Sequence, residues 1–404
     1  MTNQTSRLHA GRPDYAILVT ALALVVIGLI FVYSASFAVA IEAFNNANYF
    51  IVRQVAAATL GLAAMLVFMR FDYHRLRAIS PLFMLAAVLS LALVLVIGGD
   101  AYGARRWIPL GPLPPFQPSE FAKLAIIIYI SAWLASRGKT VGSFALGFVP
   151  FTLSVGLVAG LILIEPDTGT AFVIILTTAA LFFLAGANVA HLGAMAGIVA
   201  VIGVMLVLGG GHRGDRVFAF LSAEEDPLGL GFQIRQLLIA LGSGGVEGLG
   251  LGVSRQKFGY IPAAHTDGIF AIVGEETGFI GSMVVVVLFA YLAYRGFRVA
   301  LNARDDFGFF LAMGVTCWIA FQTLINIGGI SRSIPMTGIP MPFVSYGGSS
   351  LIMLLSAVGV LLNVSRYSKG QAYIERPERK RQTVRNNAVK RVPQRKQQPG
   401  EAIT

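Results

Sequence analysis

Residues 144–185 read FALGFVPFTLSVGLVAGLILIEPDTGTAFVIILTTAALFFLA, two apolar runs separated by Glu165, Pro166 and Asp167. Each run has about the 20 mostly apolar residues that an α-helix needs to cross the hydrocarbon core of a bilayer. The two carboxylates are costly inside a bilayer, and the proline breaks a helix. The pattern therefore predicts two membrane spans, 144–164 and 168–185, joined by a sharp corner; a single kinked span is the alternative.

Eight further runs of the same kind lie on either side of this pair. They are 15–39, 50–69, 79–98, 118–135, 190–208, 268–292, 307–328 and 347–364. Of the 404 residues, 56% are hydrophobic and only 13% are charged, whereas a soluble domain has about 25% charged residues. With a single cysteine, Cys317, the chain has no internal disulfide. This composition excludes a soluble, disordered or disulfide-stapled protein and predicts an all-α polytopic membrane protein with ten transmembrane helices.

Ten spans place both termini on the same side of the membrane. The distribution of the 31 Lys and Arg residues predicts that this side is the cytoplasm. The predicted parts are an N-terminal tail, 1–14, a ten-helix domain, 15–365, in which 209–267 is a large extracytoplasmic loop, and a basic tail, 366–404. The basic tail has few apolar residues, so we expect it to be disordered and held near anionic lipids. No folded reader module accompanies its charge, so nucleic-acid binding is not expected.

Polar and ionisable side chains collect at the predicted extracytoplasmic ends of the spans, where such residues are usually functional. They are Arg53, Arg106, Gln117, Glu120, Lys123, Glu165, Asp167, His265, Thr266, Asp267 and Ser345. Gly347 and Gly348 lie beside them and allow close approach of the backbone. Every even-numbered span begins on this side, and the free N–H groups and positive dipole end of a helix N-terminus attract anions. Pro118, Asp167 and Asp267 suit the first positions or caps of such helices. The pattern predicts a site for a lipid-linked phosphate or pyrophosphate.

Structural roles are the alternative for most of these residues. Arg53 could anchor a span end at the membrane interface, and Asp167 could cap a helix. His265 could simply bond nearby backbone. Glu120 and Lys123 lie three residues apart on one helix face and could form a buried structural pair.

Asp267 differs from the other carboxylates at these span ends. It follows the glycine-rich segment 241–259, and no other carboxylate lies within the same helical turn. Glu275 and Glu276 lie about 12–14 Å deeper at 1.5 Å per residue, which predicts structural or span-to-span partners for them. A functional role is therefore favoured for Asp267.

Ten segments of the chain resemble motifs of the SEDS family (shape, elongation, division and sporulation). They are 33–36 (YSAS), 53–54 (RQ), 106–108 (RWI), 117–123 (QPSEFAK), 166–170 (PDTGT), 232–245 (FQIRQLLIALGSGG), 250–257 (GLGVSRQK), 265–267 (HTD), 274–281 (GEETGFIG) and 337–350 (TGIPMPFVSYGGSS). The resemblance covers about 14–367 and leaves out both tails. The strings at 254–257 and 265–267 are closer to the division branch, FtsW, than to the elongation branch, RodA.

The resemblance implies a ten-span peptidoglycan glycosyltransferase of the bacterial cytoplasmic membrane. Such an enzyme polymerises lipid II, the undecaprenyl-pyrophosphate-linked disaccharide-pentapeptide, into glycan strands on the outer leaflet during cell division. It works with a class B penicillin-binding protein, which crosslinks the strands, and with other divisome proteins.

In the mechanism that this implies, Asp267 is the general base. Arg53, Arg106 and Lys123, with the helix N-termini, stabilise the pyrophosphate leaving group. A divalent cation, Mg²⁺ or Mn²⁺, could share that task, although no ligand cluster in the sequence argues for one. The other residues expected to contact the substrate are Gln117, Glu120, Asp167, His265, Thr266, Ser345, Gly347 and Gly348.

Other functions stay open at this point. A flippase that carries lipid II between leaflets would also use membrane carboxylates such as Glu165 and Asp167. Against it, the ionisable residues concentrate on one side, and the chain shows no internal repeat. A scaffold that recruits the crosslinking partner is a third possibility. Within the family, an elongation-type polymerase is the alternative.

Overall fold

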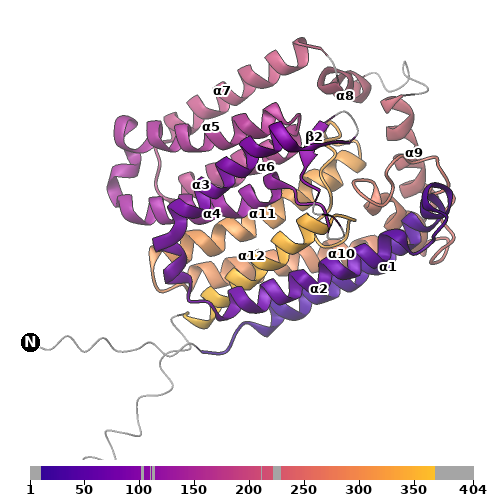
Figure 1. The fold of residues 1–404 in the computed structure, drawn as a ribbon, viewed down its shortest axis with the longest axis horizontal. Coiled ribbons are helices and arrows are strands. Elements are labelled where there is room, and N and C mark those ends of the chain that lie inside the picture. The colour runs from indigo at the N-terminus through magenta and orange to yellow at the C-terminus, as the bar shows by residue number, and fades with distance from the viewer. Residues whose placement is uncertain are drawn as a thin grey trace, which may run out of the picture.

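The computed structural model describes residues 11–101, 104–109, 111, 114–210, 212–221 and 229–368. Most of its helices lie roughly side by side in one bundle (Figure 1). The long helices are α1 (Tyr15–Phe44), α2 (Tyr49–Arg70), α3 (Tyr73–Ile97), α4 (Pro118–Arg137), α5 (Val149–Ile164), α6 (Thr168–Leu184), α7 (Val189–Leu208), α10 (Ile269–Leu301), α11 (Asp306–Ile330) and α12 (Gly348–Arg366). These helices match the ten predicted spans, and the all-α polytopic membrane fold is confirmed.

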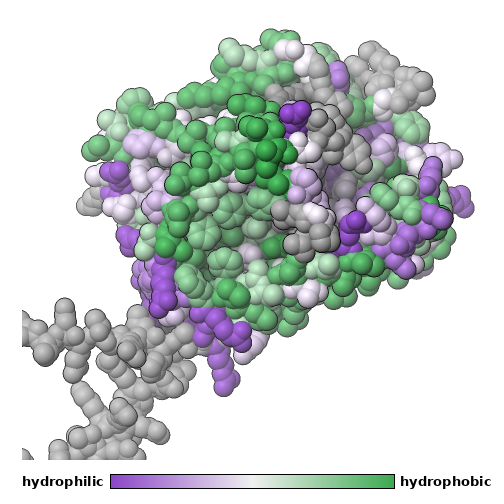
Figure 2. Space-filling view, in the orientation of Figure 1, coloured by the Kyte–Doolittle hydropathy of each residue, from purple (hydrophilic) through white to green (hydrophobic). Residues whose placement is uncertain are grey.

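The lengths and composition of these helices suit a membrane. In the described part of the chain, nine helical segments are long and apolar enough to cross a bilayer, and α6, with 17 residues, is a shorter apolar helix. Hydrophobic side chains cover the flank of the bundle in Figure 2, while hydrophilic ones gather toward its two ends. The break between α5 and α6 falls at 165–167, so the kinked-span alternative is wrong.

Local signals explain where several helices begin. Asp14 caps α1 by accepting hydrogen bonds from the N–H groups of Ala16 and Ile17. Pro118 opens α4, and Asp167 caps α6 through the N–H of Thr170 at 3.1 Å, both as predicted. The prediction that Asp267 caps a helix is wrong, because Gly268 is the N-cap of α10 and receives no side-chain cap. The carboxylate of Asp267 is therefore not engaged as a helix cap.

The two described ends of the chain meet at one end of the bundle. The Gly11 N–H donates to the Arg366 carbonyl at 2.8 Å, and the Asp14 N–H donates to Ser365 Oγ at 3.0 Å. We call this end the termini end, and the opposite end, where α8 and α9 lie in Figure 1, the loop end. Residues 1–10 and 369–404, which make up most of the predicted tails, lie outside the described residues.

Burial separates central from peripheral helices. In the most apolar windows of α11 and α12, 78% of the residues are buried, and in α4 72% are, whereas in α7 only 6% are. α2 packs along α12, and α3 packs along α4. α7 therefore lies at the edge of the bundle, against α6 and α8.

The segment predicted as a large loop, 209–267, contains two helices that the sequence did not predict. They are α8 (His212–Leu221) and α9 (Leu230–Ser243). A short antiparallel pair, β1 (Gly99–Ala101) and β2 (Ala104–Trp107), also lies at the loop end. Between α4 and α5, a 3₁₀ turn (Gly138–Gly142) and a π-helical turn (Phe144–Phe148) complete the described elements. Of these elements, α8 and α9 lie beside Asp267.

Candidate active site

Asp267 lines a small pocket of about 30 Å³ at the loop end. The pocket is enclosed by side chains from α8, α9 and the loop before α12: Arg216, Leu230, Gln233, Ile234 and Met336. The backbone around Asp267 is held by α11, because Asn326 Nδ2 donates to the Asp267 carbonyl at 2.9 Å and to the Ile339 carbonyl at 2.8 Å. This arrangement leaves the carboxylate facing the pocket.

Burial dominates the electrostatics of the Asp267 carboxyl. Burial raises its pKa above the usual range for aspartate, while the hydrogen bond from Thr266 Oγ1 at 3.2 Å and the positive charge of Arg216 work against that rise. A general base is most effective when its pKa lies near the operating pH. The direction of the shift is therefore the one that proton abstraction near neutral pH requires.

Arg216 is the cation that the sequence analysis missed. It lies on α8, where its Nη1 donates to the Thr337 carbonyl at 2.8 Å. Burial lowers the pKa of its guanidinium, an effect that Asp267 and Asp167 oppose and Arg106 reinforces. An arginine stays protonated in proteins. Arg216 is thus a positive charge that interacts electrostatically with Asp267, Asp167 and Arg106.

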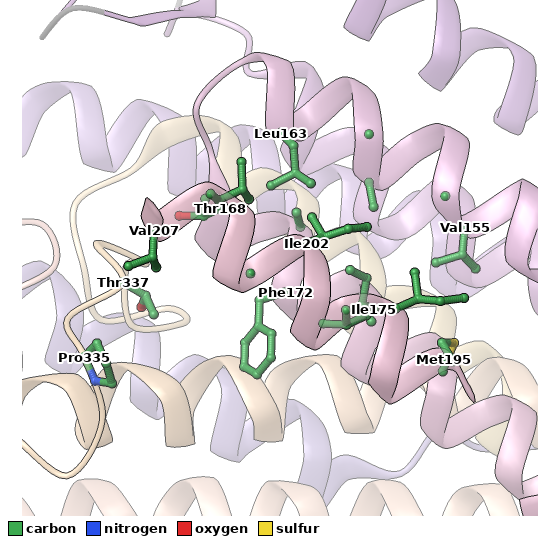
Figure 3. Close-up of a pocket in the computed structure, with 18 of the residues that line it drawn as sticks. Val155, Leu163, Thr168, Phe172, Ile175, Met195, Ile202, Val207, Pro335 and Thr337 are labelled. Atoms are coloured by element: carbon green, nitrogen blue, oxygen red, sulfur yellow. The ribbon is translucent and has the colours of Figure 1, made fainter. Parts of the chain in front are cut away.

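An apolar groove of about 370 Å³ adjoins the Asp267 pocket, and Arg216 and Met336 line both. Its walls come from α5, α6 and α7. Figure 3 shows Thr337 and Val207 at one end of this groove and Val155 and Met195 at the other. The groove therefore runs along the bundle from the charged loop end toward the membrane-spanning middle, and its lining suits a hydrocarbon chain.

The corner between α5 and α6 is tied to β2 by an arginine. Arg106 Nε donates to the Glu165 carbonyl at 2.9 Å, and its Nη2 donates to the Pro166 carbonyl. Glu165 is only 1% exposed, and neither of its carboxylate oxygens has a hydrogen-bond partner. Burial, with a contribution from the charge of Asp167, raises the pKa of Glu165 to about 8, although Arg106 opposes the shift.

This raised pKa predicts a pH-dependent stability. The ordinary pKa of a glutamate is 4.5. Between pH 4.5 and 8 the folded protein keeps a proton that the unfolded chain has lost, so the stability of the wild type falls as the pH rises. We expect Glu165→Gln to have the wild-type thermal midpoint near pH 5 and a higher one near pH 8. The exposed Glu247→Gln is the control, and parallel curves for Glu165→Gln and wild type would contradict the shift.

His265 faces a different group, built from aromatic side chains of α2 and the loop before α12. Its ring lies 4.5 Å from the Phe50 ring and 5.6 Å from the Tyr346 ring, and its carbonyl accepts from the Tyr346 N–H at 2.9 Å. Burial lowers the pKa of His265 to about 4, so the ring is neutral near pH 7. Arg53 is exposed and stacks over Tyr49 at 3.7 Å, which favours an anchoring role.

The starts of α2, α4 and α12 meet at four of the residues predicted to bind substrate: Gln117, Ser345, Gly347 and Gly348. Gln54 holds the Ser345 carbonyl and the Gly347 N–H, each at 3.2 Å. The Gln117 N–H donates to Ser349 Oγ at 3.1 Å. A Cβ at Gly348 would lie 2.9 Å from a Pro114 side-chain carbon, so only glycine permits this approach. These contacts show a packing role for residues that the sequence suggested as substrate-binding.

Lys123 and Glu120 lie in the core of the bundle. Their side chains are nearly inaccessible and form an ion pair at 2.8 Å, and Lys123 Nζ also donates to Gln322 Oε1 at 2.9 Å. Trp318 Nε1 donates to the same oxygen at 2.7 Å. The structure favours the structural-pair interpretation and leaves no surface of Lys123 for a pyrophosphate.

Among the described residues, no group of three or more His, Cys, Asp or Glu side chains could hold a metal ion. Participation of Mg²⁺ or Mn²⁺ therefore stays a prediction. The loop end offers instead two separate sets of groups on either side of 265–268. One is Asp267 with Arg216 and the apolar groove, and the other is His265 with its aromatic neighbours.

Comparisons with known proteins agree with this architecture. The family model FTSW_RODA_SPOVE, described as cell cycle protein, matches residues 15–370. Stage V sporulation protein E of Bacillus subtilis is 46% identical over 363 residues, covering 88% of this chain and 98% of that protein. The probable peptidoglycan glycosyltransferase FtsW of Geobacter metallireducens is 41% identical over 361 residues, covering 89% of this chain and 96% of that protein.

Solved structures share the fold. A chain from a peptidoglycan synthase complex, described in terms of the structural coordination of polymerization and crosslinking, superposes with a TM-score of 0.72 at 28% identity. The match covers 90% of this chain and 99% of that chain. The rod shape determining protein RodA of Thermus thermophilus superposes with a TM-score of 0.67 at 27% identity, covering 91% and 99%.

Proposed function

Because the chain belongs to the FtsW/RodA/SpoVE family of cell cycle proteins, we propose that it polymerises lipid II with Asp267 as the general base. Relatives in this family are named peptidoglycan glycosyltransferases, and the chain is an enzyme of that class. The observation that carries the proposal is the placement of Arg216, which lines both the Asp267 pocket and the apolar groove. A base, a fixed cation and a hydrocarbon site are thereby contiguous.

The proposed reaction uses each of these three parts. Asp267 takes the proton from the 4-hydroxyl of the GlcNAc unit of incoming lipid II as that oxygen attacks the anomeric carbon of the growing strand. The bond from this carbon to the pyrophosphate breaks, and the configuration inverts from α to β. The departing undecaprenyl pyrophosphate gains negative charge, which Arg216, assisted by Arg106, stabilises. No nucleotide is needed, because the activated bond belongs to the donor.

The groove between α5, α6 and α7 would hold part of the polyprenyl chain. Its lining is almost wholly apolar, and Arg216 at its loop end would keep the pyrophosphate beside Asp267. The donor would then be held both by its lipid and by its phosphate, and this would position the anomeric carbon. Positioning of this kind is a large part of catalysis.

This role of the groove predicts the effect of filling it. Gly160 on α5 lines the groove, and a Cβ built there meets no atom within 4 Å. We expect Gly160→Leu to raise the KM for lipid II about tenfold with a smaller change in kcat, because it removes binding volume and no reacting group. Gly197→Leu on α7 is the matched control, since Gly197 is equally open but does not line the groove. An equal rise in KM for both variants would contradict this assignment.

One assay tests the activity itself. Purified protein in detergent is supplied with lipid II, with and without a class B penicillin-binding protein, and the glycan products are separated by length. Detergent micelles have no second leaflet, so glycan chains can come only from a polymerase. Absence of chains under both conditions would contradict the proposal and favour the flippase or scaffold alternatives.

The proposal extends to location and partners. The chain is a multi-pass membrane protein, and we place it in the bacterial cytoplasmic membrane with the loop end facing out. A solved relative is part of a peptidoglycan synthase complex, which supports a class B penicillin-binding protein as the crosslinking partner. Division rather than elongation is the proposed setting, on the names of its FtsW relatives. Other divisome proteins, and anionic lipids at the basic tail, complete the proposed partners.

A further inference from the structure

α10 is two helices joined at Gly278, where φ is 64° and ψ is −162°. The first half, 269–277, begins two residues after Asp267, with Gly268 as its N-cap. Backbone from the preceding segment fills the break, because the N–H groups of Phe279 and Ile280 donate to the carbonyls of Gly245 and Val246 at 2.9 and 3.2 Å. The half-helix that follows Asp267 is therefore a separate unit. Its orientation is set by its own side-chain contacts rather than by the rest of α10.

A buried ion pair holds the C-terminal end of this half-helix. Lys257 Nζ lies 2.9 Å from Glu276 Oε1, and both residues are 1% exposed. Ser34 on α1 joins the pair, since its Oγ donates to Glu276 Oε1 at 2.6 Å and lies 3.2 Å from Lys257 Nζ. The Gly252 carbonyl accepts from Lys257 Nζ at 2.7 Å. We call Ser34, Lys257 and Glu276 the triad.

The neighbouring glutamate, Glu275, also bonds to the segment that precedes the half-helix. Glu275 accepts from Ser254 Oγ at 2.5 Å and from the Arg255 N–H at 2.9 Å. The segment 254–267 thus begins beside the C-terminal end of the half-helix and runs back to the N-terminal end. There Asn326 fixes the Asp267 carbonyl. The half-helix and the segment before it form a closed loop that is held at both ends.

Burial of a charged pair needs an explanation, because such a pair contributes little net stability compared with apolar side chains of similar size. Lys and Glu are almost never fully buried unless paired. α1 contains another buried serine, Ser36, whose hydroxyl has no hydrogen-bond partner. The hydroxyl of Ser34, two residues earlier, is instead hydrogen-bonded to Glu276 and Lys257. The motif at 33–36 therefore supplies one specific contact to the Asp267 loop.

We propose that the triad positions Asp267 for proton transfer by fixing the half-helix 269–277 to α1. The inference rests on the proposed function, because it concerns the same base. Ser34, Lys257 and Glu276 are positioning residues that do not touch the substrate. A small shift of a catalytic group costs up to about a hundredfold in rate, so loosening the triad lowers kcat while the groove and Arg216 continue to bind lipid II.

The first test exchanges single hydroxyls on α1. In Ser34→Ala we expect kcat to fall about tenfold, with the KM for lipid II within about twofold of wild type. The thermal midpoint is expected to fall slightly, because one buried hydrogen bond is lost. Ser34→Thr keeps the hydroxyl and restores kcat. Ser36→Ala is the matched control, on the same helix and also buried, and keeps wild-type kinetics. A wild-type kcat in Ser34→Ala, or equal losses in Ser34→Ala and Ser36→Ala, would overturn the inference.

The second test separates positioning from stability. Lys257→Met leaves Glu276 as an unpaired buried charge and is expected to lower the thermal midpoint. Lys257→Met combined with Glu276→Gln removes both charges and restores the midpoint. A positioning role keeps kcat low in the double variant, whereas recovery of kcat together with the midpoint would overturn the inference. Polymerisation by Asp267→Asn would instead contradict the proposed function, so the two failures are distinguishable.

Discussion

Replacing Asp267 with asparagine is expected to abolish polymerisation of lipid II, with a loss of about a thousandfold or more in kcat. Asparagine keeps the shape of the side chain but cannot accept the proton of the attacking hydroxyl. Burial already raises the pKa of Asp267, so the neutral side chain suits its environment and the fold is expected to persist. Turnover of lipid II by purified protein in detergent measures the loss, and direct binding of lipid II shows that the substrate site remains.

Asp215→Asn is the control for this experiment. Asp215 is an exposed carboxylate on α8, directly before Arg216, and it does not line the Asp267 pocket. Its removal changes the charge near the site without removing the proposed base, so we expect wild-type turnover. Near wild-type polymerisation by Asp267→Asn would remove this residue from the mechanism. Equal losses in both variants would indicate a general electrostatic effect.

Replacing Arg216 with glutamine is expected to lower kcat about a hundredfold, because the pyrophosphate then departs without its nearest fixed cation. The pH profile should also change. The positive charge of Arg216 holds down the pKa of Asp267, so its loss lets that pKa rise further. A base must be deprotonated to act, and kcat of Arg216→Gln is therefore expected to fall at a higher pH than kcat of wild type as the solution is acidified.

Two companion variants sharpen the Arg216 result. Arg216→Lys keeps the charge and is expected to retain part of the rate and the wild-type acid limb, although it loses the planar fork that matches a phosphate. Arg332→Gln removes another arginine that contacts α8, through the Phe220 carbonyl at 3.1 Å, without lining the pocket. A wild-type rate and pH profile in Arg216→Gln would contradict the assignment. A comparable loss in Arg332→Gln would show that docking of α8, rather than charge, had been lost.

The fold was predictable because bilayer thickness imposes a length on every span. Ten apolar runs of suitable length predicted ten helices, and even the corner at 165–167 followed from a proline between carboxylates. Asp267 was singled out because no other carboxylate lies within the same helical turn, and its role as the base stays a prediction. Structural roles were predicted for Glu275 and Glu276 and are confirmed, because Glu276 accepts from Ser34 on α1 and Glu275 accepts from the Arg255 N–H.

The candidate site was harder to predict, because sequence spacing does not reveal which way a polar helix face points. Glu120 and Lys123 do share a face as expected, but that face meets Gln322 in the core. Arg216 was missed because α8 has only ten residues, too few for a membrane span, and lies in the segment predicted as a loop. The one available signal was the amphipathic pattern of 212–221, which places Arg216 beside apolar residues on a short interfacial helix.

The meeting of Gly11 and Arg366 has a practical consequence for labelling. A small fluorophore attached at each of these two residues would lie on the same patch of surface, so the two labels would stay within energy-transfer range of each other. Both would lie on the far side of the molecule from Asp267, where neither can crowd the incoming substrate. Labels at the termini end are therefore suited to imaging the working enzyme.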